Sequence, residues 1–248
     1  MAIVEIQREG AVALITLNRP EARNALNAAL AQAICDAMAV CQDASAIVLT
    51  GAGTAFCAGL DLKNLGVEKL SDLPNAIDAP RLSAVPVIAA INGPAVTGGF
   101  EMALACDFMI GSERAAFADT HVRVGVFPGP VLIDLPRRIG MAKAREMSLT
   151  GNFIDAKTAL NIGLLNHLVP HDELVPQALK LAHDMAGHDV ALIKTMRQAW
   201  DATAALPYTE ARTVRDDFSL RSGSGERRAG ELAARREQVI ERAKHRDR

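Results

Sequence analysis

Apolar positions in the first part of the chain form short alternating runs followed by one helical pattern. Residues 4–7 and 11–17 alternate on either side of Gly10, which predicts a pair of strands joined by a turn. Apolar residues then recur every four positions with alanines beside them, which predicts an amphipathic helix capped by Asn24. The repeating residues are Leu26, Leu30, Ile34 and Met38.

Three more apolar runs, each bounded by Gly, Pro or Ser, predict buried strands. They cover residues 46–49, 85–91 and 108–111. Strand, loop, helix and strand therefore follow one another in the first half of the chain, which is typical of an α/β protein. The sequence shows no self-similarity at a fixed period, so any repeat is structural only.

The pattern becomes helical after Gly140. Predicted helices cover residues 142–149, 155–162, 173–186, 190–205, 209–221 and 226–243. The four residues 222–225, Ser-Gly-Ser-Gly, are a flexible type of connection between the last two. The final helix interleaves acids among its basic residues and has an apolar stripe, which favours packing over nucleic-acid binding. We therefore divide the chain into a core, residues 1–190, and a C-terminal helical region, residues 191–248.

Composition excludes several functional classes. The 248 residues include 27 Lys and Arg and 29 Asp and Glu, a formal net charge of −2, so no overall field would recruit nucleic acid or an anionic membrane. The apolar runs are shorter than the ~20 residues of a membrane helix, and the N-terminus has no secretory pattern, so we expect a cytoplasmic protein. The four cysteines lack metal or redox spacing, and Pro170 interrupts the pair His167 and His171, so we expect no metal site.

Two glycine-rich loops are candidates for chemistry. Residues 92–101, NGPAVTGGFE, follow a predicted strand and lead into a helix-like run, so the N–H of Gly98 is available at a helix N-terminus. Residues 54–62, TAFCAGLDL, follow another predicted strand and offer a second donor. Two such donors can form an oxyanion hole, which is worth roughly 3 to 4 kcal/mol per donor in well-studied hydrolases. Taken alone, the glycines could equally close a tight turn.

Five segments in order along the chain carry a resemblance to a known family. They are NRPEARNALN (18–27), VLTGAGTAFCAGLDL (48–62), PVIAAINGPAVTGGFEMALACDF (86–108), GVFPG (125–129) and LTGNFIDAKTALNIGLLNHLVP (149–170). In these segments the chain resembles the crotonase superfamily, the enoyl-CoA hydratase/isomerase family. The resemblance extends from residue 18 to residue 170.

The resemblance implies a fold, a substrate and an assembly. The fold is the α/β crotonase-like (ClpP/crotonase) spiral of β-β-α turns, with C-terminal helices that pack in homotrimers or dimers of trimers. The substrate is an acyl-CoA thioester, and no cofactor beyond coenzyme A is expected. The implied oxyanion donors are the backbone N–H groups of Leu60 and Gly98. The implied contacts with substrate or coenzyme A are Ala22, Arg23, Ala58, Leu60, Asp61, Leu62, Lys63, Gly98 and Gly129.

The resemblance also implies two acid/base residues, of which only one matches. Hydratases of this family use two glutamates, and Glu101 occupies the first position, although a lone Glu at a helix start is usually only a capping charge. The second position holds His121. An imidazole can exchange protons near neutral pH but differs from a carboxylate in reach, charge and tautomer, so its role stays open. Asp119 is close enough in sequence to orient His121, but the Asp-Thr-His stretch is weak evidence for a dyad.

The loop after these residues departs from the family pattern as well. The usual glycine pair is replaced by Pro130, Val131 and Leu132 after Gly129. We expect the N–H of Gly129 to be free to hold water. Because Pro130 fixes φ and donates no N–H, the loop should be stiffer and the pocket beside His121 more apolar.

Three functional hypotheses follow. The first is an enoyl-CoA hydratase that adds water to 2-enoyl-CoA through a thioester enolate, as part of fatty acid metabolism. The second is another reaction of the family, such as double-bond isomerisation or thioester hydrolysis, for which one acid/base residue suffices. The third is an acyl-CoA- or RNA-binding protein with vestigial catalysis, against which the balanced charge and Glu101 argue. A Clp-type serine peptidase is disfavoured because residues 95–99 contain no serine.

Overall fold

The computed structural model describes residues 2–61, 74–222, 235–237 and 240–241. The chain divides into two compact units, Met1–His188 and Asp189–Arg248. The division lies next to the boundary at residue 190 that the sequence suggested. The predicted Ser-Gly connection and most of the predicted helix 226–243 lie outside the described residues.

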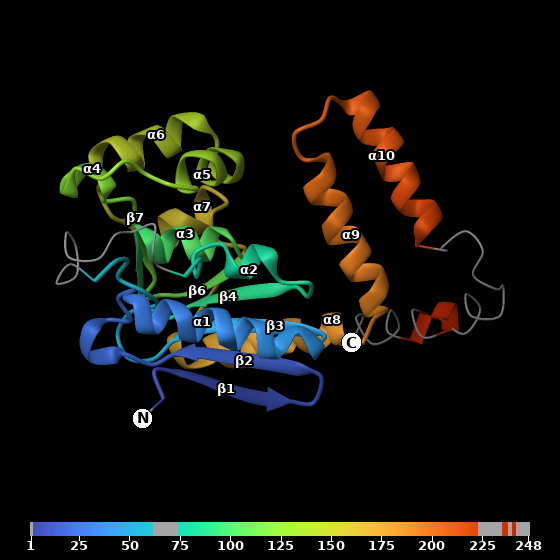
Figure 1. The fold of residues 1–248 in the computed structure, drawn as a ribbon, viewed down its shortest axis with the longest axis horizontal. Helices are drawn as coiled ribbons and strands as arrows, with labels where there is room; N and C mark the ends of the chain where they lie inside the picture. Colours follow the sequence, from blue (N-terminus) through green and yellow to red (C-terminus); the bar gives the residue numbers. More distant parts are fainter. Residues whose placement is uncertain (1, 62–73, 223–234, 238–239, 242–248) are drawn as a thin grey trace. The chain divides into compact units, whose positions relative to one another are not determined.

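The first unit is built on a six-stranded sheet in the order β1-β2-β3-β4-β6-β9 (Figure 1). Its strands are Val4–Glu9, Val12–Leu17, Ala46–Gly51, Val87–Ile91, Phe108–Ser112 and His167–Val169. β1 pairs antiparallel with β2, as the turn at Gly10 predicted, and the other neighbours pair parallel. Every residue of β3 and β4 is buried, which explains why these strands are continuous apolar runs.

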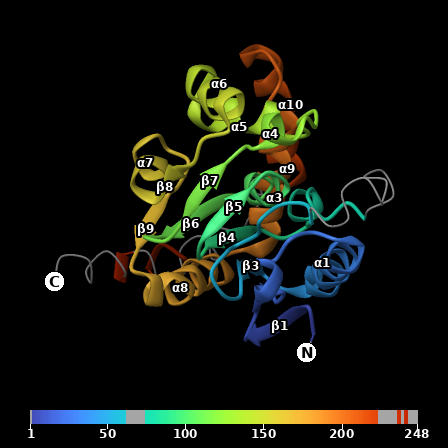
Figure 2. The ribbon, with the colours of Figure 1, turned by 90° about the vertical axis from the view of Figure 1, so that its left-hand side faces the viewer.

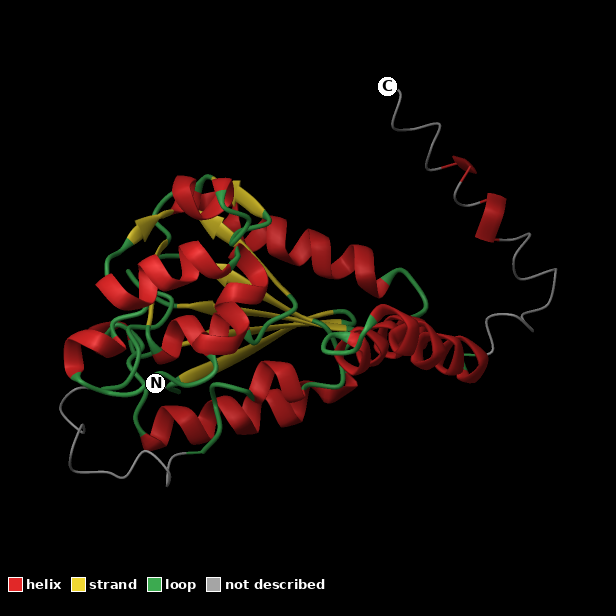
Figure 3. Ribbon diagram, turned by 90° about the horizontal axis from the view of Figure 1, so that it is seen from above, coloured by secondary structure: helices red, strands yellow, loops and turns green. Residues whose placement is uncertain are grey.

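Helices cover both faces of this sheet because alternate side chains of each strand point to opposite faces (Figure 2). On one face, Ile47 and Leu49 of β3 pack in a cluster that includes Leu30 of α1 (Ala28–Val40). On the other, Ala46 and Val48 pack in a cluster that includes Leu174 of α8 (Leu174–Ala186). The strands consequently run between helices when the unit is seen from above (Figure 3).

The residue that caps α1 differs from the expectation. Asn27 caps the helix, and its side chain accepts a hydrogen bond from Leu30 N at 2.9 Å. Asn24, the predicted cap, is fully buried with φ 55° and instead donates to the carbonyl groups of Ala52 and Ala55 at 3.0 and 2.9 Å. The prediction is wrong because Asn24 holds two loops together, four residues before the helix begins at Ala28.

A second, three-stranded sheet includes part of the glycine-rich segment of residues 92–101. It has the order β5-β7-β8, with strands Pro94–Val96, Ala116–Ala118 and Ile154–Asp155. β5 and β7 pair parallel, and β7 and β8 pair antiparallel. These strands of two or three residues are too short to give a periodic pattern, so the sequence analysis did not predict them.

Short helices of the first unit follow these strands, and several lie on the side of α3 away from the large sheet (Figure 1). They are α2 (Ala79–Leu82), α3 (Gly98–Leu104), α4 (His121–Val124), α5 (Val131–Ile139), α6 (Met141–Thr150) and α7 (Ala156–Asn161). Among the described residues, 3-10 turns cover Pro20–Ala22, Cys41–Asp43 and His171–Glu173. α6, α7 and α8 begin and end within one residue of the predicted helices. α5 was not predicted, and it contains Pro136.

The C-terminal unit contains the helical hairpin of α9 (Val190–Thr203) and α10 (Tyr208–Arg221). Asp189 caps α9 by accepting a hydrogen bond from Leu192 N at 3.1 Å. Pro207 directly precedes α10. Both helices agree with the predicted ones to within two residues at each end.

Candidate active site

Glu101 lies in the first turn of α3, at the end of the loop that follows β5. All residues of α3 are buried, and Glu101 itself is 3% exposed. The helix begins after Thr97, a β-branched residue with φ 52° and ψ −115°, a backbone conformation that glycine adopts far more easily. Strain of this kind gathers at functional sites, where the surrounding structure enforces it.

The Glu101 carboxylate is fixed by backbone donors from the next loop. Its Oε1 accepts hydrogen bonds from Gly129 N at 3.1 Å and from Val131 N at 3.2 Å. The expectation that the Gly129 N–H is free for water is therefore wrong, because the N–H groups on either side of Pro130 both point at Glu101. Burial raises the pKa of Glu101 above its usual value, and the Val131 hydrogen bond and His121 oppose the rise.

His121 faces Glu101 across the site. It is the first residue of α4, is 5% exposed, and places Nε2 4.0 Å from Glu101 Oε2. Its Nδ1 lies 2.6 Å from Oδ1 of Asp119, a residue that is 1% exposed. The structure thus places the predicted acid/base residues and Asp119 in one buried row, with the imidazole between two carboxyl groups.

The two predicted oxyanion loops lie side by side. Leu26 N donates to Gly59 O at 2.7 Å and Asp61 N donates to Leu26 O at 2.8 Å, a parallel bridge that turns the N–H of Leu60 the other way. A Cβ atom added at Gly59 would lie 3.5 Å from Gly98 N, so the second donor is adjacent. Within the described part of the chain, neither Leu60 N nor Gly98 N donates to a protein acceptor.

A cavity of about 360 Å³ opens where these groups meet. It is bounded by Glu101 and His121, the two predicted acid/base residues, by Leu60 and by mostly apolar side chains. The described residues that line it are Leu26, Ala31, Leu60, Pro74, Asn75, Ala76, Ile77, Glu101, His121, Val126, Phe127, Gly129 and Pro130. A buried carboxylate and an imidazole line this mostly apolar cavity together with Leu60, and Gly98 lies against two of the other lining residues, Ile77 and Leu26. Such a site can bind a carbonyl oxygen and move protons beside it.

The residues expected to hold coenzyme A form a second pair of adjacent segments. Ala22 ends the 3-10 turn Pro20–Ala22, and Arg23 O accepts a hydrogen bond from Ala58 N at 3.0 Å. Asp61 Oδ2 lies 3.4 Å from the guanidinium of Arg19, which partly balances the acidic charge there. Leu62 and Lys63, also expected contacts, lie outside the described residues.

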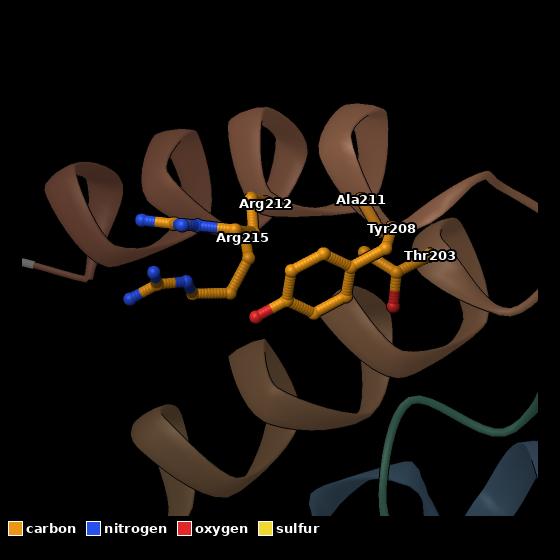
Figure 4. Close-up of a pocket in the computed structure, with 5 residues that line it drawn as sticks. All are labelled: Thr203, Tyr208, Ala211, Arg212 and Arg215. Atoms are coloured by element: carbon orange, nitrogen blue, oxygen red, sulfur yellow. The ribbon is translucent and has the colours of Figure 1, made fainter.

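A larger cavity, of about 530 Å³, lies in the C-terminal unit (Figure 4). Its described lining residues are Thr203, Tyr208, Ala211, Arg212 and Arg215. Both guanidinium groups reach the same end of the cavity in Figure 4, and Arg215 pairs with Asp216 at 2.9 Å. This lining offers neither a carboxylate nor an imidazole, so the smaller cavity beside Glu101 is the candidate active site.

The described residues contain no cluster of three or more His, Cys, Asp or Glu side chains arranged to hold a metal ion. No helix among them is long and apolar enough to cross a bilayer. The hydrogen bond from Val131 N to Glu101 could not be predicted from the sequence, because no side-chain motif marks a backbone donor.

The fold and the site define the class of protein. A buried glutamate in the first turn of α3 shares one cavity with Leu60 and His121, on an α/β core whose large sheet is mostly parallel. Residues 7–231 match the model of the enoyl-CoA hydratase/isomerase family, and the chain belongs to that family. The α/β crotonase fold inferred from the sequence is therefore confirmed.

Individual relatives agree with this assignment. The chain is 35% identical to a probable mitochondrial enoyl-CoA hydratase of Dictyostelium discoideum, over 90% of this chain and 84% of that protein. It is 36% identical to the 2,3-dehydroadipyl-CoA hydratase of Escherichia coli, over 80% and 82% of the two chains. Among solved structures, it matches an enoyl-CoA hydratase from Bacillus anthracis with a TM-score of 0.88 and 28% identity, over 96% of this chain and 97% of the other.

Proposed function

We propose that this protein is an enoyl-CoA hydratase that adds water to a 2-enoyl-CoA ester as part of fatty acid metabolism. The observation that carries the proposal is the placement of Glu101 in one cavity with Leu60 and next to the Gly98 N–H. Membership of the enoyl-CoA hydratase/isomerase family and the names of the relatives support it.

The geometry suggests how the reaction proceeds. The thioester carbonyl oxygen accepts hydrogen bonds from Leu60 N and Gly98 N, which stabilise the negative charge of the enolate. The Glu101 carboxylate takes a proton from water, and the resulting hydroxide adds to the β-carbon. His121 supplies the proton that the α-carbon gains. The raised pKa of Glu101, caused by burial, makes its carboxylate a stronger base near neutral pH.

The acyl group occupies the apolar part of the cavity. Leu26, Ile77, Val126 and Phe127 line it together with Pro130, so hydrocarbon chains fit better there than charged ones. Coenzyme A runs along the paired segments of Ala22, Arg23, Ala58 and Asp61 outside the cavity. No cofactor other than coenzyme A is proposed, and chelation with EDTA should leave the rate unchanged.

A spectrophotometric assay tests the proposal. Loss of the absorbance of the conjugated thioester is followed with crotonyl-CoA and with longer 2-enoyl-CoA esters. Activity should disappear in Glu101→Gln and persist in Glu113→Gln, which replaces an exposed glutamate. Purified, folded wild-type protein that hydrates none of these esters would contradict the proposal.

The imidazole at position 121 favours keeping a second candidate, another reaction of the family. Isomerisation of a 3-enoyl-CoA ester moves one proton and needs one acid/base residue, and its product appears as a gain of the same absorbance. Thioester hydrolysis releases the free thiol of coenzyme A, which a thiol reagent detects. A protein that only binds acyl-CoA or RNA would show none of the three signals, and the net charge of −2 argues against RNA.

The C-terminal helices are proposed to join three chains into a homotrimer, or six into a dimer of trimers. They expose several large apolar side chains, which favours burial against another copy. These are Met196, Trp200, Tyr208 and Leu220. Light scattering during gel filtration measures the mass directly.

The proposed compartment is the cytoplasm, whereas the names of two relatives place those proteins in mitochondria and peroxisomes, so cell fractionation is the test.

A further inference from the structure

Asp119 contacts His121 at two places, the imidazole ring and the backbone. Asp119 follows β7 directly, and its Oδ1 lies 2.6 Å from Nδ1 of the imidazole and 3.4 Å from the backbone N of the same histidine. Both side chains are almost fully buried. One carboxylate oxygen therefore fixes the histidine by both its ring and its backbone.

A neighbouring contact fixes this loop against the start of α3. Thr97 N donates to Ala118 O at 2.9 Å, and the hydroxyl groups of Thr97 and Thr120 lie 2.6 Å apart. Thr97 is the residue immediately before Gly98. The position of the imidazole is thus tied to the position of the Gly98 N–H, which leaves the choice of tautomer as the remaining freedom.

Asp119 decides the tautomer. Burial opposes its ionisation, but the hydrogen bond and charge of His121 outweigh this and hold the pKa of Asp119 below its usual value. Ser148 contributes to the lowering, although Oδ2 of Asp119 has no described partner in hydrogen-bonding geometry. An ionised carboxylate can only accept hydrogen bonds, so Nδ1 of His121 must carry the proton. The other ring nitrogen, Nε2, is then the atom that faces Glu101.

We propose that Asp119 is a positioning residue, which holds the Nδ1–H tautomer of His121 so that Nε2 exchanges the α-carbon proton. The inference rests on the proposed hydration. Water gives its proton to the Glu101 carboxylate, its hydroxide bonds to the β-carbon, and the imidazolium Nε2–H gives its proton to the α-carbon. The enzyme is reset when the protonated Glu101 returns its proton to Nε2. A single water can relay it, since atoms 4.0 Å apart can both be hydrogen-bonded to one water molecule.

Two measurements on Asp119→Asn test this role. In ¹⁵N spectra of the neutral imidazoles, wild-type His121 should carry its proton on Nδ1. In the variant the proton should move to Nε2, because the amide can donate to Nδ1. His121→Gln identifies the signal by its loss. The kcat for crotonyl-CoA should fall about 100-fold, the scale of a lost proton-transfer group, with KM within about threefold.

A double-variant cycle separates positioning from mere structural support. Asp119→Asn should change the rate of His121→Gln by no more than about twofold, because the group it acts through is already gone. Equal losses in both backgrounds, or an Nε2–H tautomer in the wild type, would overturn the proposal. Asp36→Asn, an exposed carboxylate on α1, is the matched control and should keep wild-type rate and tautomer.

The spectra also distinguish this inference from the proposed function. The tautomer is measured without substrate, so the spectra can support or overturn the role of Asp119 even if the wild type hydrates no ester. Thermal unfolding of Asp119→Asn shows whether the variant is folded. If it is not, the wild-type tautomer alone decides: a proton on Nδ1 supports the proposal and a proton on Nε2 overturns it.

Discussion

Replacing Gly59 with alanine should separate the two loops that we propose to form the oxyanion hole. Gly59 has φ +86°, and a Cβ there would lie 2.8 Å from Val96 O, 3.3 Å from Thr97 Cβ and 3.5 Å from Gly98 N. The left-handed backbone costs a non-glycine residue about 1 to 2 kcal/mol. The contact with a backbone carbonyl adds about 1 to 3 kcal/mol, since overpacking forces the chain to shift. The expected loss in free energy of unfolding is therefore about 2 to 5 kcal/mol.

The catalytic effect of Gly59→Ala should exceed what instability explains. Because the shift moves Leu60 N away from Gly98 N, kcat should fall about 10²- to 10³-fold, the effect of losing one oxyanion donor. The matched control is Gly163→Ala, at φ +76° with nothing within 4 Å of the new Cβ. It should lose about 1 to 2 kcal/mol, or about 2 to 8 °C in Tm, and keep its kcat. Folded Gly59→Ala protein with kcat within threefold of wild type would refute the reasoning.

Three other predictions concern stability and reactivity. Burial raises the pKa of Glu101 above its ordinary value of 4.5, so the folded state holds this proton more tightly than the unfolded state and loses stability as pH rises through the raised pKa. Glu101→Gln should thus raise Tm relative to wild type at about pH 8 and not at about pH 4, and a uniform change at both would count against the assignment. Burial raises the pKa of Cys57 to about 12, so iodoacetamide at about pH 8 should modify it only after unfolding, as mass spectrometry of the peptide would show. Leu30→Ala, at a fully buried position of α1, should cost about 2 to 5 kcal/mol in urea unfolding, and a loss below about 1 kcal/mol would contradict its place in the core.

The sequence by itself determined the elements whose pattern is local and long. Leu30, Ile34 and Met38 recur at the helical period because one face of α1 is buried, and the continuous apolar run of β4 follows from burial on both faces. The resemblance gave the family and hence the fold, since its motifs are contiguous along the chain. It also placed Glu101, Leu60 and Gly98 as candidates without any coordinates.

Only the tertiary structure decided the contacts between segments distant in sequence. The use of the Gly129 and Val131 N–H groups by Glu101 depends on how α5 packs against α3, and no residue type signals it. Asn24 was mistaken for a helix cap because an asparagine side chain can either cap a helix or bind backbone groups of another loop. In the folded protein it donates hydrogen bonds to the carbonyl groups of Ala52 and Ala55. The distance of 2.6 Å between Asp119 Oδ1 and His121 Nδ1 could not be predicted from the sequence either. The side chains of two residues separated by one position can point toward each other or away from each other. The local sequence pattern determines the periodicity and backbone preference of an element. The hydrogen-bond partners of a side chain and the burial of its charge depend instead on which distant segments of the chain come together in the fold.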